Sequence, residues 1–175
     1  MKFFYTVFLA IVALTTLNSC LGKSVEDEYK NWREANDEWL QRQKESGQYT
    51  VLTAPWDPSA TTLIRWHNDR QLTQNNLMPL ITSTVDVVYY LRLYDGTPVD
   101  SSFRANQPDR VYRSKLTENV EGWMIALTNM HVGDSCTVII PYQQGYGSTN
   151  RGDIPPYSNL VFDMKLVNIY KYKAN

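Results

Sequence analysis

The stretch that decides the fold is residues 120–162, which read VEGWMIALTNMHVGDSCTVIIPYQQGYGSTNRGDIPPYSNLVF. Residues 121–130 place apolar side chains at three- and four-residue steps, the spacing of one helix face. These side chains are Trp123, Leu127 and Met130. Gly133-Asp134 then turns the chain into a β-rich run at residues 136–141, and a second run begins at Leu160. This order predicts a short helix followed by two strands.

Two segments alternate apolar and polar residues, which is the period of a strand with one buried face. Residues 85–93 alternate in this way, and Asp95-Gly96 is a turn sequence that reverses the chain after them. Residues 160–170 form the second segment. One of its faces carries Leu160, Phe162, Met164 and Leu166, and the other carries Asp163 and Lys165. A short helix laid across several antiparallel strands predicts an α+β fold.

Several short motifs occur along this part of the chain in a fixed order. They are Tyr89, Asp95-Gly96, Asp100-Ser101-Ser102, Val120-Glu121-Gly122-Trp123, Tyr146-Gly147, Ile154-Pro155-Pro156 and Leu160-Val161-Phe162-Asp163. Each motif alone is unspecific, because buried aromatic residues and Tyr-Gly pairs are common in folded proteins. Their joint order resembles the FKBP family of peptidyl-prolyl isomerases over about residues 82–170. The resemblance implies an FKBP-like antiparallel β-sheet wrapped around one short α-helix, in a domain at residues 82–175.

The resemblance also implies a pocket for proline-containing peptides. It assigns catalytic positions to Tyr89, Asp100, Trp123, Tyr146 and Phe162, and substrate-binding positions to Val99, Val120 and Ile154. In the family, the tryptophan forms the pocket floor and the tyrosine hydroxyl binds a carbonyl of the ligand. Rotation about an X-Pro bond has a barrier of roughly 20 kcal/mol because amide resonance must be broken. An apolar pocket favours the twisted, less polar amide, so the chemistry requires no metal, cofactor or nucleophile.

Two departures from the family pattern concern the pocket wall. The phenylalanine that precedes the pocket aspartate in the family is Val99 here, which keeps the apolar character but not the ring. The second pocket phenylalanine aligns with Asp109, or with Val111 if an insertion falls earlier. A charge at this rim predicts weaker binding of apolar peptides.

A third departure concerns the charge near the pocket aspartate. The arginine that usually pairs with this aspartate aligns with Ala105, so Asp100 lacks its habitual counter-ion. Arg104 and Arg110 are near enough in sequence to replace it. Together, Ala105 and Asp109 predict a catalytic activity lower than is typical of the family.

The N-terminus has the pattern of an export signal. Lys2 precedes an apolar run too short to span a membrane, which needs roughly twenty residues. Leu17-Asn18-Ser19-Cys20 resembles the bacterial lipobox, which implies removal of residues 1–19 and lipidation of Cys20, with palmitate among its acyl chains. An ordinary cleaved signal with an incidental cysteine is the alternative. Leu21 after the cysteine favours the outer membrane over the inner one, on its periplasmic or its surface face.

Residues 20–47 are predicted to be a tether followed by an amphipathic helix at residues 25–45. Ser24 is placed to cap this helix, Trp32 and Trp39 lie on its apolar side, and Gly47 ends it. The helix either packs against its own domain or binds a second copy or a partner. Packing against its own domain is the first expectation, and secreted relatives that dimerise through such an extension support the second alternative by analogy only.

Residues 48–81 are predicted to be a β-rich lead-in segment. Strand-like runs at residues 49–52 and 62–67 are separated by Pro55, Asp57-Pro58 and Ser59. The amide-rich residues 68–78 are predicted to form a surface loop.

The composition excludes several classes of function. The 175 residues carry a formal net charge of −1, which gives no reason to expect a nucleic-acid partner. His67 and His131 are the two histidines, and Cys136 is the one cysteine besides Cys20. Cys136 lies in a strand-like run and is predicted to pack as a small buried side chain. A metal site or a catalytic triad is not expected.

These observations predict a lipid-anchored prolyl isomerase, or rotamase, of the cell envelope that assists the folding of exported proline-containing polypeptides. Two alternatives remain open. One is a binding module with the FKBP fold that turns over poorly. The other is a subunit of an envelope complex docked through the helix at residues 25–45.

Overall fold

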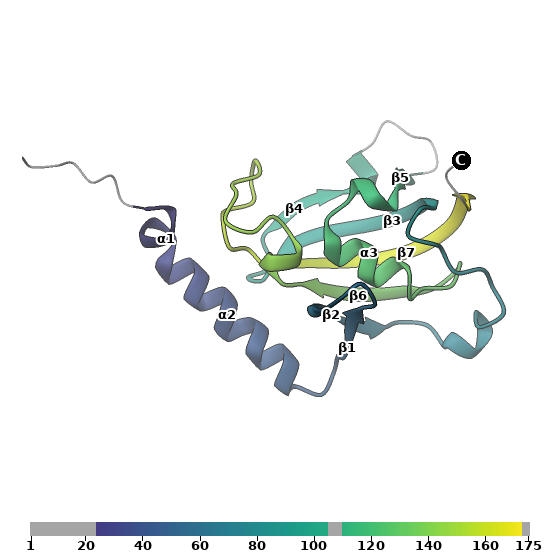
Figure 1. Ribbon diagram of the computed structural model, residues 1–175, viewed down its shortest axis with the longest axis horizontal. Helices are drawn as coiled ribbons and strands as arrows, with labels where there is room; N and C mark the ends of the chain where they lie inside the picture. The colour runs from purple at the N-terminus through teal and green to yellow at the C-terminus, as the bar shows by residue number, and fades with distance from the viewer. Residues whose placement is uncertain (1–23, 105–109, 173–175) are drawn as a thin grey trace, which may run out of the picture.

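The computed structural model describes residues 24–104 and 110–172 (Figure 1). Its helices and strands follow in the order α1 (Val25–Glu28), α2 (Lys30–Glu45), β1 (Thr50–Ala54), β2 (Asp57–Trp66), β3 (Thr84–Leu93), β4 (Pro98–Ser101), β5 (Tyr112–Lys115), α3 (Glu121–Leu127), β6 (Ser135–Ile140) and β7 (Leu160–Lys171). Four 3₁₀ turns join them: η1 (Arg70–Leu72), η2 (Ser102–Arg104), η3 (Leu116–Glu118) and η4 (Tyr142–Gln144). In the described part of the chain, no helix is long and apolar enough to cross a membrane.

The strands form one antiparallel sheet of seven strands in the order β1-β2-β6-β7-β3-β4, with β5 paired to β3. The short helix α3 lies across this sheet (Figure 1), so the predicted α+β class and FKBP-like arrangement are confirmed. The lead-in segment supplies β1 and β2, and β2 pairs with β6. The sheet is therefore larger than the part that the family motifs cover.

Alternation along β7 separates the two faces of the sheet. The side chains predicted to share one face are all buried in the core beneath α3: Leu160, Phe162, Met164 and Leu166. They pack there with Trp123, Leu127 and Met130, the predicted helix face. The helix itself ends at Leu127, and Met130 lies just beyond it. The apolar face of the strand, which repeats every two residues, and that of the helix, which repeats about every 3.6 residues, therefore pack in one core.

Gly122 sets the distance between α3 and the sheet. A Cβ at this position would lie 2.3 Å from Cγ2 of the fully buried Ile140 on β6. No side chain fits there unless the helix moves or Ile140 changes its rotamer. The glycine before Trp123 is therefore a packing requirement, and it holds the tryptophan against the sheet.

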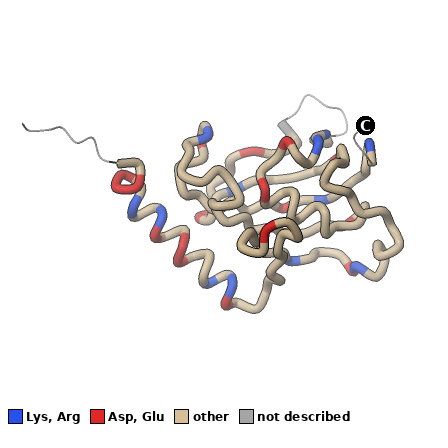
Figure 2. The backbone as a smooth tube through the Cα atoms, in the orientation of Figure 1, with Lys and Arg blue, Asp and Glu red and all other residues tan. Residues whose placement is uncertain are grey.

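The N-terminal helix packs on the opposite face of the sheet. Leu40 contacts a row of three buried side chains, Leu63, Ile139 and Val161, which pair across β2, β6 and β7. Trp39 packs against the edge of this cluster. Basic and acidic residues are interspersed along α2 (Figure 2), and most of them are exposed.

A pair of buried asparagines joins α2 to the start of β7. The backbone N–H of Asn159 donates to Oδ1 of Asn36 at 2.8 Å, and its side-chain amide donates to the Asn36 carbonyl at 2.7 Å. The Asn36 amide in turn donates to the carbonyl of Trp32, whose indole N–H donates to Ser158. These bonds satisfy polar groups that would otherwise be buried without partners.

Two expectations about the N-terminal half are corrected. The predicted helix at residues 25–45 is two helices, because Tyr29 leaves the helical conformation (φ −103°, ψ 15°). Ser24 caps the first of them, as predicted. Asp57, Pro58 and Ser59, predicted to separate two strands, begin β2. The register of β1 and β2 is irregular between Thr53 and Ala54, so Pro58 falls where regular pairing is interrupted.

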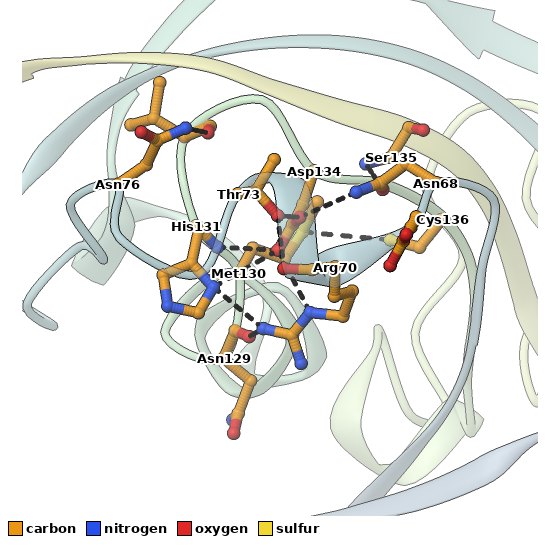
Figure 3. Close-up of polar contacts among 12 residues, drawn as sticks. Asn68, Arg70, Thr73, Asn76, Asn129, Met130, His131, Asp134, Ser135 and Cys136 are labelled. Atoms are coloured by element: carbon orange, nitrogen blue, oxygen red, sulfur yellow. Dashed lines mark hydrogen bonds and ion pairs between the residues drawn. The ribbon is translucent and has the colours of Figure 1, made fainter.

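The amide-rich loop before β3 is tied to the turn between α3 and β6 by the fully buried Asp134 (Figure 3). The Asp134 carboxylate accepts hydrogen bonds from Asn68 Nδ2 (3.0 Å), Thr73 Oγ1 (2.5 Å) and the His131 N–H (2.8 Å). It also forms an ion pair with Arg70 at 3.3 Å. Burial raises the pKa of Asp134, but the hydrogen bonds and Arg70 outweigh burial and lower this pKa overall. The loop is therefore anchored by an ionised, fully bonded carboxylate.

Candidate active site

Three aromatic rings from three elements form the centre of the site. Trp123 of α3 lies edge to face against Tyr89 of β3 and Phe162 of β7, with ring centroids 5.3 Å and 5.4 Å away. Tyr89 and Phe162 are 5.8 Å apart. Edge-to-face contacts at these distances are favourable for aromatic rings. Trp123 Nε1 is buried without a hydrogen-bond partner among the described residues, so ring contacts hold the indole.

The pairing of β3 with β7 explains why these rings meet. Leu91 stands opposite Phe162, and Tyr89 stands opposite Met164, so their side chains share the face that α3 covers. A shift of one residue would turn them to the α2 face.

A cavity of about 450 Å³ opens above these rings. The described residues that line it are Tyr89, Leu91, Asp100, Tyr112, Glu118, Asn119, Val120, Trp123, Tyr146, Arg151 and Phe162. All five positions predicted to be catalytic are in this set, together with Val120. Val99 and Ile154, predicted to bind substrate, are buried in the adjoining core and do not line the cavity.

Asp100 enters the cavity from β4, held by two donors. The Tyr89 hydroxyl donates to its Oδ2 at 2.6 Å, and the Ser101 backbone N–H donates to its Oδ1 at 2.7 Å. Burial, followed by the hydrogen bond to Asp100, raises the pKa of Tyr89 far above its usual range. Tyr89 therefore stays protonated and fixes the position of the carboxylate.

Tyr146 lines the cavity from the loop that follows η4. Its ring is half-buried, and its hydroxyl has no hydrogen-bond partner among residues 24–104 and 110–172. Burial raises the pKa of Tyr146, although the nearby Arg151 opposes this shift. The hydroxyl is therefore a neutral donor, free to bind a ligand carbonyl.

The structure adds residues to the site that sequence reasoning missed. Tyr112 of β5 lies 5.7 Å from the Tyr89 ring and 5.9 Å from Trp123, and so supplies an aromatic wall. Sequence alignment placed this wall at Asp109 or Val111. Val111 is buried outside the cavity lining, and Asp109 lies outside the described residues. The nearness of an aromatic residue to the aligned position was the signal that could have identified Tyr112.

The other missed residues are Leu91, Glu118, Asn119 and Arg151. Leu91 was predicted as part of an alternating strand, and its position two residues from Tyr89 on the same face was the available signal. Glu118 and Asn119 immediately precede Val120. No pattern in the sequence distinguishes Arg151 from other loop residues.

Of the positions considered as partners for Asp100, Arg110 is the one whose side chain the structure describes. Its guanidinium lies over the Phe103 ring, 5.5 Å from the centroid. Ala105, where the family has arginine, lies outside the described residues.

The site offers little covalent chemistry. In the described part of the chain, no group of three or more His, Cys, Asp or Glu residues could hold a metal ion. Cys136 is fully buried as predicted, and burial raises the pKa of its thiol far above the usual range. The cavity instead combines aromatic walls, a fixed carboxylate and a neutral phenol, which suits the binding of a short apolar peptide.

Comparison with known proteins agrees with this geometry. The macrophage infectivity potentiator of Trypanosoma cruzi is 41% identical over 92 residues, which cover 52% of this chain and 45% of that protein. The FKBP-type 22 kDa peptidyl-prolyl cis-trans isomerase of Escherichia coli is 38% identical over 93 residues, or 53% of this chain and 44% of that protein. The chain thus spans about half the length of the curated relatives it matches.

The fold is also similar to solved structures. The crystal structure of a peptidyl-prolyl cis-trans isomerase from Pseudomonas syringae superposes with a TM-score of 0.66 at 25% sequence identity. The match covers 81% of this chain and 95% of that one. Residues 78–167 match the model of the FKBP-type peptidyl-prolyl cis-trans isomerases. The chain therefore belongs to the FKBP-type peptidyl-prolyl cis-trans isomerase family.

Proposed function

We propose that this protein is a peptidyl-prolyl cis-trans isomerase that acts on exported polypeptides in the cell envelope. The observation that carries the proposal is the cavity itself. Its floor is Trp123, its walls are Tyr89, Tyr112 and Phe162, and it is also lined by Tyr146, whose hydroxyl has no hydrogen-bond partner among the described residues.

Each group has a role in rotating an X-Pro bond. The proline ring packs on Trp123 among the other aromatic rings of the cavity. There the twisted amide, which has lost resonance and is less polar, is stabilised relative to the planar one. Tyr146 donates a hydrogen bond to a carbonyl of the peptide and orients it. Every 1.36 kcal/mol by which these contacts favour the twisted state raises the rate about tenfold.

Asp100 adds a fixed negative charge near the rotating group. Because Tyr89 and the Ser101 N–H already hold the carboxylate in place, little reorganisation accompanies the reaction. No bond to the protein forms, and no proton is transferred.

The location of the protein is part of the proposal. The signal pattern of residues 1–19 and the lipobox-like sequence at Cys20 support lipid anchoring, and both lie outside the described residues. The outer membrane is favoured by Leu21, and the clients would be exported chains whose folding is limited by slow X-Pro isomerisation. A second copy or a partner would bind through the charged outer surface of α2, because its apolar side is occupied by the protein's own sheet.

The alternative is a binding module that holds proline-containing segments without turning them over. The absence of the family arginine at Ala105 supports it, because the carboxylate of Asp100 would then lack its usual counter-ion. Both functions use the same cavity, so only a rate measurement separates them.

Exchange NMR on a proline peptide at equilibrium, with substoichiometric protein, tests both functions at once. Catalysis predicts faster cis–trans exchange, which Tyr146→Phe and Trp123→Ala diminish. Shifted peptide resonances with an unchanged exchange rate would favour the binding module. If neither changed, both functions would be refuted.

A further inference from the structure

The lining of the cavity carries three charged side chains: Asp100, Glu118 and Arg151. Arg151 is the only cation among the described lining residues. It comes from the loop between β6 and β7, which stands out from the body of the molecule (Figure 1) and has a basic position next to an acidic one at its tip (Figure 2). Asp153, in the same turn, does not line the cavity, and most of the other lining side chains are aromatic or apolar.

The backbone around Arg151 is well defined. Its N–H donates to the Ile154 carbonyl at 3.0 Å, and the Ile154 N–H donates back to the Arg151 carbonyl at 3.0 Å. Gly152 occupies the left-handed region (φ 58°) that this tight turn requires. Ile154 is buried in the core, so it anchors the turn. The arginine is therefore carried on a fixed hairpin.

The guanidinium of Arg151 faces the site without a carboxylate partner. It lies 5.4 Å from the centroid of the Tyr146 ring, which also lines the cavity. Among residues 24–104 and 110–172, Arg151 forms no ion pair, whereas Arg70, Arg92 and Arg113 each bind an aspartate. A planar guanidinium binds carboxylates through two parallel hydrogen bonds. This one is available to a carboxylate of the peptide.

We propose that Arg151 determines specificity by favouring peptides with an acidic side chain next to the proline. The inference rests on the proposed function, since it concerns what the same cavity accepts. Glu118, also on the rim, repels a second carboxylate. Because Glu118 comes from η3 and Arg151 from the β6–β7 loop, the preference holds on only one side of the proline.

The expected size of the effect is modest, because the guanidinium is exposed. Ion pairs of this kind change affinities by roughly twofold to fivefold. The preference also declines with salt, because the screening length falls from about 10 Å at 0.1 M to about 3 Å at 1 M.

The test compares proline tetrapeptides that carry either glutamate or its neutral isostere glutamine, before or after the proline. The readout is the ratio of kcat/KM for the glutamate peptide to that for the glutamine peptide. In the unaltered protein this ratio is expected to be about three at low salt in one of the two series. Arg151→Gln should bring it to about one or below, and Arg151→Lys should keep part of it.

Arg65→Gln is the matched control. Arg65 is also exposed and also lies over a tyrosine ring, that of Tyr49, at 5.2 Å. It follows Leu63 on the face of the sheet that α2 covers, far from the cavity. The variant loses the same charge, so the ratio should stay as in the unaltered protein.

A ratio of one in the unaltered protein, or a ratio that survives Arg151→Gln, would overturn the proposal. So would a loss of the ratio in Arg65→Gln, because that would point to net charge alone. Failure of the proposed function is a different result, in which even the glutamine peptides are not accelerated. In that case the same ratios, taken from peptide dissociation constants, test Arg151 on their own.

Discussion

Replacing Gly122 with alanine tests how closely α3 lies on the sheet. The added Cβ would lie 2.3 Å from Cγ2 of Ile140, 2.7 Å from its Cγ1 and 2.8 Å from its Cδ1. Ordinary contact begins at 3.4 Å. The helix must therefore move away from β6 by about 1 Å, or Ile140 must leave its rotamer.

The net effect follows from two opposing contributions. Overpacking a core costs about 1–3 kcal/mol, and replacing a helical glycine with alanine stabilises the helix by about 1 kcal/mol. Because Ile140 is fully buried and three of its atoms clash, we expect Gly122→Ala to lower the free energy of unfolding by about 2 kcal/mol. The helix carries Trp123, so catalysis should fall with it.

A double-mutant cycle identifies the contact. Ile140→Ala removes all three clashing atoms and should cost about 2–5 kcal/mol through the cavity it leaves. In the double variant the new Cβ occupies part of that cavity. The double variant should therefore lose about 1–2 kcal/mol less unfolding free energy than the sum of the two single-variant losses. Guanidinium denaturation of the four proteins measures these differences.

Ile139→Ala provides the control for this cycle. Ile139 is adjacent in sequence and equally buried, but its side chain lies on the α2 face with Leu40. Its effect should add to that of Gly122→Ala within about 0.5 kcal/mol. Additivity in the Ile140 cycle would refute the packing argument.

Three further predictions concern other parts of the molecule. Asp134→Asn should cost about 3 kcal/mol at pH 7 by breaking a buried ion pair. Because the pKa of Asp134 is lowered in the folded state, this stability is present above the unfolded-state pKa of about 4 and is lost as pH falls through the folded-state pKa. Denaturation curves at pH 7 and pH 3 should therefore differ much less for the variant than for the unaltered protein. Asn36→Ala should cost about 1–3 kcal/mol because the buried backbone N–H of Asn159 loses its acceptor, Asn36 Oδ1, and an unchanged melting midpoint would contradict this role. Tyr112→Ala should lower kcat/KM for proline peptides by roughly threefold to tenfold, while Tyr112→Phe, which keeps the ring, should lower it little; equal losses in both variants would contradict a wall built by ring contacts.

The sequence predicted the parts of the fold that regular patterns encode. Alternation over β3 and β7 and helical spacing around Trp123 reflect burial along one face, which is a local property of the chain. The ordered motifs then placed Tyr89 and Asp100 in one pocket, where the structure joins them by a hydrogen bond.

The features that were missed depend on contacts between distant residues. Asn36 and Asn159 are separated by 123 positions, and no periodicity in the sequence predicts the hydrogen bonds between them. Tyr112 reaches the pocket because β5 pairs with β3, and Arg151 reaches it through a turn built on Ile154. Such contacts follow from the assembled sheet and leave no local pattern in the chain.

The most direct test of the proposed function is the rate of cis-to-trans conversion in a proline tetrapeptide after a solvent jump. It should be measured with and without the purified protein, and with a Trp123→Ala variant shown to be folded by its denaturation curve. The proposed function predicts a clear acceleration that the variant largely loses, because in the proposed mechanism the proline ring packs on Trp123, which lines the cavity. A rate equal to that in buffer, from folded protein, would contradict the account.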